Sequence, residues 1–209
     1  MSFLNISEEL LNTVEAEKVS EGTGVLASGV YTVKVEQCFI RKTDSGATMI
    51  ELATESKEGK KVFWNTCLKS GDAKGNKATY IDKNGKEQVL PGVIQAIHLF
   101  EACGLDLTKE EPSNSKVMHK DVEIEAGIFK SLTGKTFKAC VRQYESEYNG
   151  EVSIRYDIEN FLDLDGKNKD GVAMEDKFLA KIEKSPIKLL AKKSSTPNNN
   201  EVAAAASGW

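Results

Sequence analysis

The order of strand-like and helix-like segments constrains the fold more than any other feature of the sequence. Five segments alternate apolar and polar residues or are rich in β-branched and aromatic residues, which is typical of strands. These segments are 30–40, 47–54, 60–69, 135–144 and 151–161. One helix-like run, 92–103, lies between the third and the fourth of them. The order strand, strand, strand, helix, strand, strand predicts a mainly β domain.

This order is that of the OB-fold, a five-stranded Greek-key barrel that mainly holds oligonucleotides or oligosaccharides. We therefore expect an OB-fold barrel over residues 29–163, with a helix between strands 3 and 4. In such a barrel the third strand, here opening at Lys60, helps to form the ligand face. The loops at 41–46 and 144–150 would be the two that grip the ligand.

The remaining segments are predicted to be additions to this barrel. Residues 1–28 form an N-terminal arm with a helix start at Ser7, and 164–209 form a C-terminal extension. Asn84-Gly85 is a strong hairpin signal inside the Gly- and Lys-rich insertion 70–90.

Three further segments have weaker patterns. Residues 105–130 are polar and irregular, with room for a short helix or strand, and 174–184 favours a short helix. Residues 194–209 have the low-complexity composition of a disordered tail.

Charge is distributed unevenly along the chain. The net charge of −4 does not indicate a nucleic-acid binder. Residues 57–86, however, carry eight lysines against three acidic residues, a local net charge of +5 centred on the third predicted strand. A local basic surface can bind a polyanion on a neutral protein. The alternative is an ordinary solvated hairpin with surface lysines.

The third predicted strand carries one aromatic residue on each face. Val62, Trp64, Thr66 and Leu68 share one face, and Phe63, Asn65, Cys67 and Lys69 share the other. The second set is more polar, so we expect Phe63 to meet ligand and Trp64 to lie in the core. The pattern alone does not decide between the two aromatics.

The OB-fold topology places aromatic and basic residues together on the strands and loops that bind ligand. Exposed aromatics can stack bases, each contributing about 1–3 kcal/mol, and cations can follow phosphates. The candidate nucleic-acid-binding residues are Arg41, Lys42, Lys60, Lys61, Phe63, Lys69, Tyr80, Lys83, Arg142, Tyr144, Tyr148 and Arg155.

No catalytic, metal or cofactor motif is readable. Gly134-Lys135-Thr136 resembles the end of a phosphate-binding loop, but the required upstream glycine is Phe129 and a strand follows. Cys38, Cys67, Cys103 and Cys140 form no Cys-x-x-Cys motif, which favours reduced thiols. We expect a binding protein, not an enzyme.

The sequence has no feature of a membrane or secreted protein. It has no apolar run of about 18 residues, the length of a membrane span. Its first residues lack the basic region of a signal peptide. We therefore expect a cytoplasmic protein without membrane contact.

Three stretches carry a resemblance to a known family. They are Thr79–Lys86 followed by Leu90-Pro91-Gly92, the strand Val62–Leu68, and Ile158–Leu162. Together they are similar to bacteriophage single-stranded DNA-binding proteins of the OB-fold type, over roughly residues 29–163. The resemblance implies binding of single-stranded DNA without strong sequence preference, in replication, recombination or repair, in the cytoplasm of the host cell.

The resemblance also bears on the C-terminus. Many such proteins end in an acidic tail with a terminal aromatic residue that recruits replication or recombination partners. Here Trp209 is terminal, but Glu201 is the only acidic residue after Ser194. Trp209 is therefore either a partner-docking residue or a passive tail end. The alternative for the whole chain is an OB-like protein-interaction module, and an oligomer is compatible with either.

Overall fold

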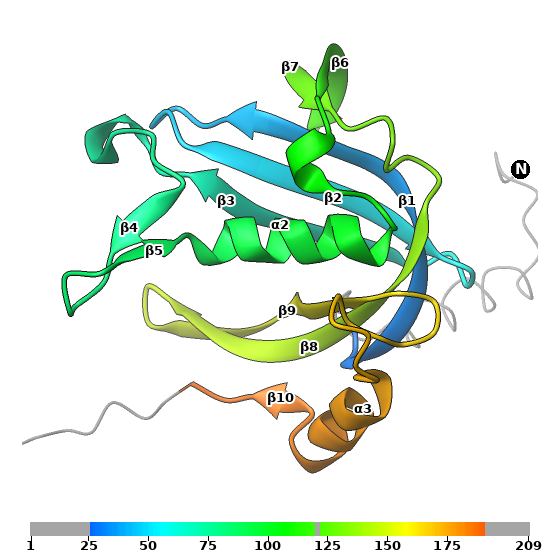
Figure 1. Cartoon of the computed structure of the whole chain (residues 1–209). Coiled ribbons are helices and arrows are strands. Elements are labelled where there is room, and N and C mark those ends of the chain that lie inside the picture. Colours follow the sequence, from blue (N-terminus) through cyan, green and yellow to red (C-terminus); the bar gives the residue numbers. More distant parts are fainter. Residues whose placement is uncertain (1–25, 120–121, 191–209) are drawn as a thin grey trace, which may run out of the picture.

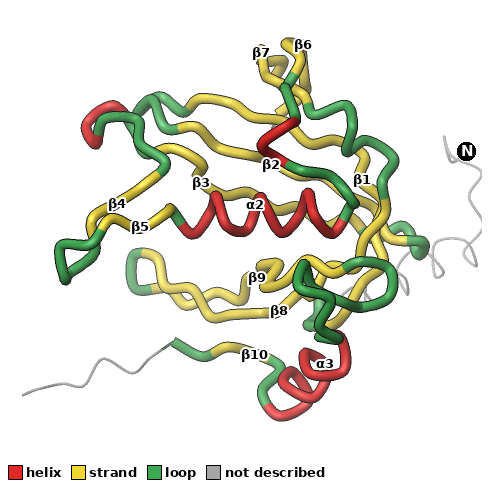
Figure 2. Tube along the Cα trace, in the orientation of Figure 1, coloured by secondary structure: helices red, strands yellow, loops and turns green. Residues whose placement is uncertain are grey.

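The computed structural model describes residues 26–119 and 122–190, and this part of the chain is mainly β (Figures 1 and 2). The strands are β1 (Gly29–Lys42), β2 (Thr48–Ser56), β3 (Lys61–Lys69), β4 (Thr79–Ile81), β5 (Glu87–Val89), β6 (Ser113–His119), β7 (Val122–Ile128), β8 (Thr136–Tyr148), β9 (Glu151–Leu162) and β10 (Ile187–Lys188). The α-helices are α2 (Pro91–Ala102) and α3 (Glu175–Lys184), and short 3-10 turns occur at η1 (Asp72–Lys74) and η2 (Leu107–Lys109).

The five predicted strands and the predicted helix are confirmed as β1, β2, β3, β8, β9 and α2. Strand β1 is shared: it pairs antiparallel with β2 along one edge and with β8 along the other. Strand β3 pairs with β2, and β9 pairs with β8, so β3 and β9 end the two arms of a curved sheet. The sheet is open, because no ladder joins β3 to β9 within the described residues.

A bulge in β1 lets this long strand serve both arms. The pairing register with β2 shifts between Val35 and Gln37. Such an extra residue bends a strand and increases its twist. The concave side of the curved sheet then surrounds one core, in which Val33, Ile50 and Phe137 are fully buried.

Helix α2 lies between β3 and β9 and covers the gap between the two arms (Figure 1). It contributes Leu99 and Phe100 to the same core. Gly92 at its start is required sterically, because a Cβ there would lie 2.2 Å from the carbonyl oxygen of Cys67 on β3. The glycine therefore lets the helix start against the edge of β3.

Two hairpins project from this sheet. The predicted insertion hairpin is confirmed as β4–β5, and its loop is the five-residue stretch 82–86, which contains Asn84-Gly85. The second hairpin, β6–β7, lies within 105–130, where we expected an irregular segment with room for a short helix or strand but no hairpin. It packs Val117 and Ala126 against Phe39 on the convex side of β1.

The C-terminal extension packs on the sheet as far as it is described. The predicted helix at 174–184 is confirmed as α3, which buries Phe178 against Cys140 and Leu162. Strand β10 then pairs in parallel with β8 at Gln143 and Tyr144. The predicted helical arm at the N-terminus and the predicted disordered tail lie almost wholly outside the described residues, and the division at residues 28 and 163 stays a prediction.

Candidate nucleic-acid interface

The two aromatic residues of β3 have opposite environments. Trp64 is 4% exposed and packs edge-on against Phe161, with ring centroids 5.0 Å apart. Phe63 is 59% exposed on the convex side of the sheet. Alternation along the strand produces this difference, since consecutive side chains point to opposite faces. The structure thus places Trp64 in the core, as expected, and leaves the Phe63 ring open to solvent.

The backbone at Phe63 is held from the opposite arm of the sheet. Its N–H donates to the Tyr156 hydroxyl on β9, with 3.1 Å between the nitrogen and the oxygen. Its cross-strand neighbour on β2 is Ala53, whose small side chain leaves the ring uncovered. Phe63 is therefore an exposed platform on an anchored strand.

The convex side around Phe63 carries paired charges. Arg41 donates to Glu51, with its Nη2 2.7 Å from Glu51 Oε1. Lys61 lies 2.6 Å from Glu36 and 3.4 Å from Glu55. Two predicted phosphate contacts, Arg41 and Lys61, are thus neutralised in the free protein. The Lys61 pairs are exposed and contribute little to stability, so they can exchange for a phosphate, whereas the Arg41–Glu51 pair is partly buried.

A cavity of about 630 Å³ opens beside the end of this face. Its wall includes Cys67, which lies on the same strand face as Phe63, four residues further along. The turn after β1 contributes Ser45, and the loop around η1 contributes Gly71 and Ala73. The β4–β5 hairpin closes the other side with Tyr80, Ile81 and Glu87. A strand, a turn, a loop and a hairpin therefore build this cavity together.

The turn after β1 and the loop around η1 are joined by a main-chain hydrogen bond. The Asp72 N–H donates to the Ser45 carbonyl oxygen at 2.9 Å. Glycines allow the close approach, since a Cβ on Gly71 would lie 2.4 Å from that oxygen and a Cβ on Gly46 would lie 2.2 Å from the Asp72 carboxylate. The cavity is consequently held open by main-chain contacts.

Lysines surround the cavity. Lys74 and Lys77 line it, and Lys69 lies two residues beyond Cys67. All three are exposed, and none forms an ion pair with another described residue. Tyr80, 43% exposed, lies at the same place. The structure thus brings together Lys69 and Tyr80 with two lysines that sequence reasoning counted only as part of the basic window.

The other basic candidates near this side are less closely grouped. Lys42 is exposed at the end of β1, and Lys83 is exposed in the β4–β5 loop. Lys60 lies in the β2–β3 turn, with its amine 5.5 Å from the centroid of the Tyr31 ring. Lys42 thus ends a strand, and Lys60 and Lys83 lie in turns that join strands.

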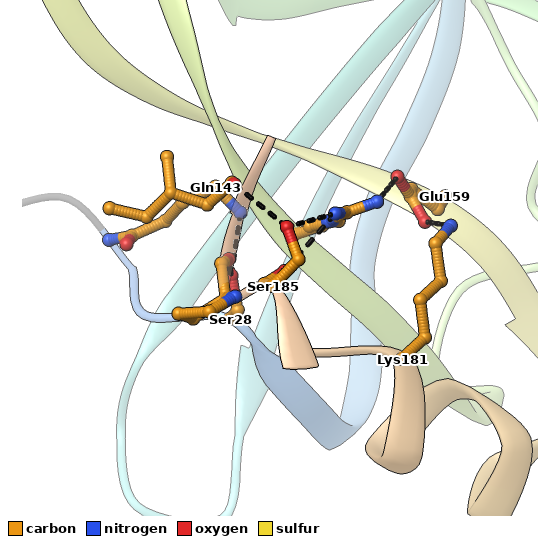
Figure 3. A network of polar contacts seen from close by, with 8 residues as sticks. Ser28, Gln143, Glu159, Lys181 and Ser185 are labelled. Carbon is orange, nitrogen blue, oxygen red and sulfur yellow. Dashed lines mark hydrogen bonds and ion pairs between the residues drawn. The ribbon is translucent and has the colours of Figure 1, made fainter. Parts of the chain in front are cut away.

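Arg142, predicted as a nucleic-acid contact, does not lie on an open surface. Its side chain is only 10% exposed. Its Nη1 donates to Glu159 at 3.3 Å, and its Nη2 donates to the carbonyl and hydroxyl oxygens of Ser185, each at 3.1 Å. The segment between α3 and β10 covers it. Figure 3 shows Ser185, Glu159 and Lys181 in this network.

The same network joins the two ends of the described chain. The Gln143 N–H donates to the Ser28 hydroxyl at 2.8 Å, and that hydroxyl donates to the Pro186 carbonyl oxygen (Figure 3). The start of β1, the middle of β8 and the C-terminal segment are thus linked here. Arg142 therefore belongs to a structural network.

The remaining candidates lie along the β8–β9 hairpin. Tyr144 and Arg155 are cross-strand neighbours on its convex side; Tyr144 is half-buried beside β10, and Arg155 is exposed. Tyr148 is 71% exposed near the hairpin tip. Val152, in the same part of the hairpin, is also exposed.

Three of the four cysteines are buried and unreactive in character. Burial raises the pKa of Cys103 and of Cys140 to about 12, and burial together with the neighbouring Cys103 raises that of Cys38. Cys67, in the cavity wall, is half-buried. Among the described residues no cluster of three metal-ligating side chains occurs.

Comparison with protein-family models and with curated proteins gives no match to this chain. None of the described helices is long and apolar enough to cross a bilayer. Trp209, the predicted partner-docking residue, lies outside the described residues. The described site thus combines an exposed aromatic ring with a cavity whose wall carries two lysines and the Glu87 carboxylate.

Proposed function

We propose that the protein binds single-stranded DNA through an OB-fold barrel. The strand order and the position of α2 support the fold, since β1 is shared by the two arms and α2 lies between the third and fourth barrel strands. In this proposal α2 and the Phe63–Tyr156 hydrogen bond close the barrel where the ladder between β3 and β9 is missing. The resemblance to phage single-stranded DNA-binding proteins points the same way.

The exposure of Phe63 carries the functional proposal. The Phe63 ring is 59% exposed in the middle of a strand whose other face forms the core. Covering the ring with a ligand would be favourable, and the adjoining cavity and lysines distinguish Phe63 from the other exposed apolar side chains. Nucleobases fit because every base has a flat face that stacks on an aromatic ring, whatever the sequence.

Phosphate contacts complete the binding mode. Lys69, Lys74 and Lys77 present unpaired cations next to the Phe63 face. Lysines neutralise phosphates and release condensed counterions, so binding by this surface weakens as salt rises. The protein acts by binding and not by catalysis, without a cofactor, in phage DNA replication, recombination or repair in the host cytoplasm.

An OB-like protein-interaction module is the second candidate. It is favoured by the ion pairs that occupy Arg41 and Lys61, which lower the free positive charge of the convex face. On that reading the Phe63 ring would meet an apolar side chain of a partner.

A binding assay separates the two candidates. Fluorescence anisotropy with labelled oligo(dT), the matching duplex and oligo(U) should give tight binding to the first, declining with salt. Phe63→Ala should weaken binding to oligo(dT), whereas Phe63→Trp should preserve it. Absence of binding to any nucleic acid at low salt, with the protein folded, would overturn the proposal in favour of the interaction module.

A further inference from the structure

A single DNA strand that runs along β3 over Phe63 would next reach the cavity beside Cys67. Phe63, Asn65 and Cys67 follow one another on the same face of β3. Four residues of a β-strand span about 13 Å, so Phe63 and Cys67 at the cavity wall lie about that far apart on one surface. The lysines at positions 74 and 77 stand on the cavity wall, where they can meet the phosphates that flank a bound nucleotide.

The lining of the cavity suits an unpaired base. Tyr80, Ile81 and Leu90 offer flat or apolar surface to the ring faces of a base. Ser45, Ser70 and Thr79 contribute hydroxyl groups, each already in a hydrogen bond within the protein. A hydroxyl oxygen has two acceptor lone pairs, so these groups can still accept from the edge of a base. The Thr79 hydroxyl already donates to the Glu87 carboxylate at 2.6 Å, which orients both groups within the wall.

We propose that this cavity is a base-binding subsite, which takes one unpaired base out of the strand that lies on Phe63. The inference rests on the proposed function and adds to it a reason for selecting single strands. A base within a duplex is stacked and paired, and extruding it costs a few kcal/mol. A base in a single strand enters at much lower cost. The cavity therefore distinguishes single-stranded from double-stranded DNA, because only the single strand has unpaired bases. The lysines attract the phosphates of both forms.

Cys67 provides a direct probe of occupancy. It lines the cavity and is half-buried, whereas Cys38, Cys103 and Cys140 are buried. Alkylation of the native protein by N-ethylmaleimide, located by peptide mass spectrometry, should modify Cys67 first. Saturating oligo(dT) should slow that reaction at least tenfold. A fully abasic oligodeoxynucleotide at saturation should protect Cys67 much less, because it brings phosphates without bases.

Filling the cavity gives an independent test. Ala73→Leu adds bulk to an exposed position on the cavity wall without altering charge. It should weaken oligo(dT) binding about tenfold and leave binding of the abasic oligomer unchanged. The matched control is Ala180→Leu on α3, which makes the same change at an exposed position that does not line this cavity and should have little effect.

The outcomes distinguish this subsite from the proposed function as a whole. If oligo(dT) binds, depends on Phe63 and yet leaves Cys67 fully reactive, the subsite is wrong and the proposed function stands. Equal losses for Ala73→Leu on oligo(dT) and on the abasic oligomer would also refute it, since the cavity would then act on the phosphates. If oligo(dT) does not bind at all, both proposals fail.

Discussion

The convex side of the sheet has two regions that look alike in sequence and differ in the folded protein. On β3 the outward residues include Phe63 and Lys69, and on β8 they include Arg142 and Tyr144. The β3 region stays open, with Phe63 exposed beside a cavity. The β8 region is covered, with Arg142 held by Glu159 and Ser185.

The β8 region is covered, and the β3 region is not, because segments further along the chain pack against β8. Helix α3, which begins 27 residues after β8 ends, packs on the outward side of that strand, and β10, which begins 39 residues after it, pairs along its edge. Hairpin β6–β7 does the same to Phe39 on β1. Alternation determines which side chains point outward, but only the packing of other segments determines which of them remain available. Only the part of the sheet that those segments leave uncovered can bind a ligand.

Charge reversal around the cavity should have the largest effect. Replacing Lys69, Lys74 and Lys77 together by Glu should weaken binding of single-stranded DNA at low salt on the order of 100-fold, because it exchanges attraction to phosphates for repulsion. The slope of log affinity against log salt should become shallower by about 2, at roughly 0.7 per lost contact on a single strand. A salt titration with oligo(dT) measures both quantities.

The matched control carries the same change in net charge on another part of the surface. Lys130, Lys177 and Lys184 are exposed and form no ion pair with other described residues. Their replacement by Glu should change affinity far less. Equal losses for the two triple variants would mean that net charge, and not the open region of β3, controls binding.

Breaking the covered region should change stability and not affinity. Arg142→Met removes the hydrogen bonds to Glu159 and Ser185 and should lower the free energy of unfolding by about 1.5–3 kcal/mol, the usual range for bonds to charged groups. Urea denaturation measures this loss, and Arg155→Met on the exposed neighbouring strand serves as the control. A strong loss of DNA affinity in the folded Arg142→Met protein would instead show that Arg142 contributes to DNA binding.

Stacking residues should differ between the two regions. Phe63→Ala should cost about 1–3 kcal/mol of binding free energy, with little dependence on salt, because stacking releases no counterions. Tyr144→Ala should cost less, since Tyr144 is half-buried beside β10. Oligo(dT) titrations at two salt concentrations measure both variants. A larger loss for Tyr144 would show that the bound strand runs along β8–β9.

Local sequence patterns predicted much of the fold. The alternation in 30–40 and the Asn-Gly signal at 84–85 each led to the element that the structure contains. Hairpin β6–β7 was missed although Val122, Ile124, Ala126 and Ile128 alternate with polar or small residues. Its partner β6 is mostly polar and carries a single buried side chain, Val117, so no pair of apolar runs marked the hairpin.

The site was predictable in part. The polarity of the Phe63 face correctly indicated which aromatic of β3 is exposed. The cavity was not predictable, because its walls depend on the contact between Asp72 and Ser45, 27 positions apart in the chain. The ion pairs of Arg41 and Lys61 likewise depend on strand register, which sequence alone did not define.

The smallest expected effect concerns the hairpin wall of the cavity and its response to pH. The Asp82 carboxylate accepts the N–H groups of Lys86 and Asn84 at 2.9 and 2.8 Å, and these bonds lower the pKa of Asp82. A lowered pKa in the folded state means that the carboxylate stabilises the loop at pH values above its ordinary pKa. This contribution is lost as pH falls through the lower, folded-state pKa.

Asp82→Asn tests this loop, because it removes the charge and keeps an acceptor oxygen. At pH 7 the Lys86 and Asn84 amides should exchange with deuterium faster in the variant than in the natural protein, by a modest factor. After correction for intrinsic exchange, the difference should vanish as pH falls through the folded-state pKa of Asp82, where both side chains are neutral. A difference that persists unchanged at the lowest pH would mean that the Asp82 charge does not hold the loop. The wall formed by the hairpin would then depend on the β4–β5 ladder alone.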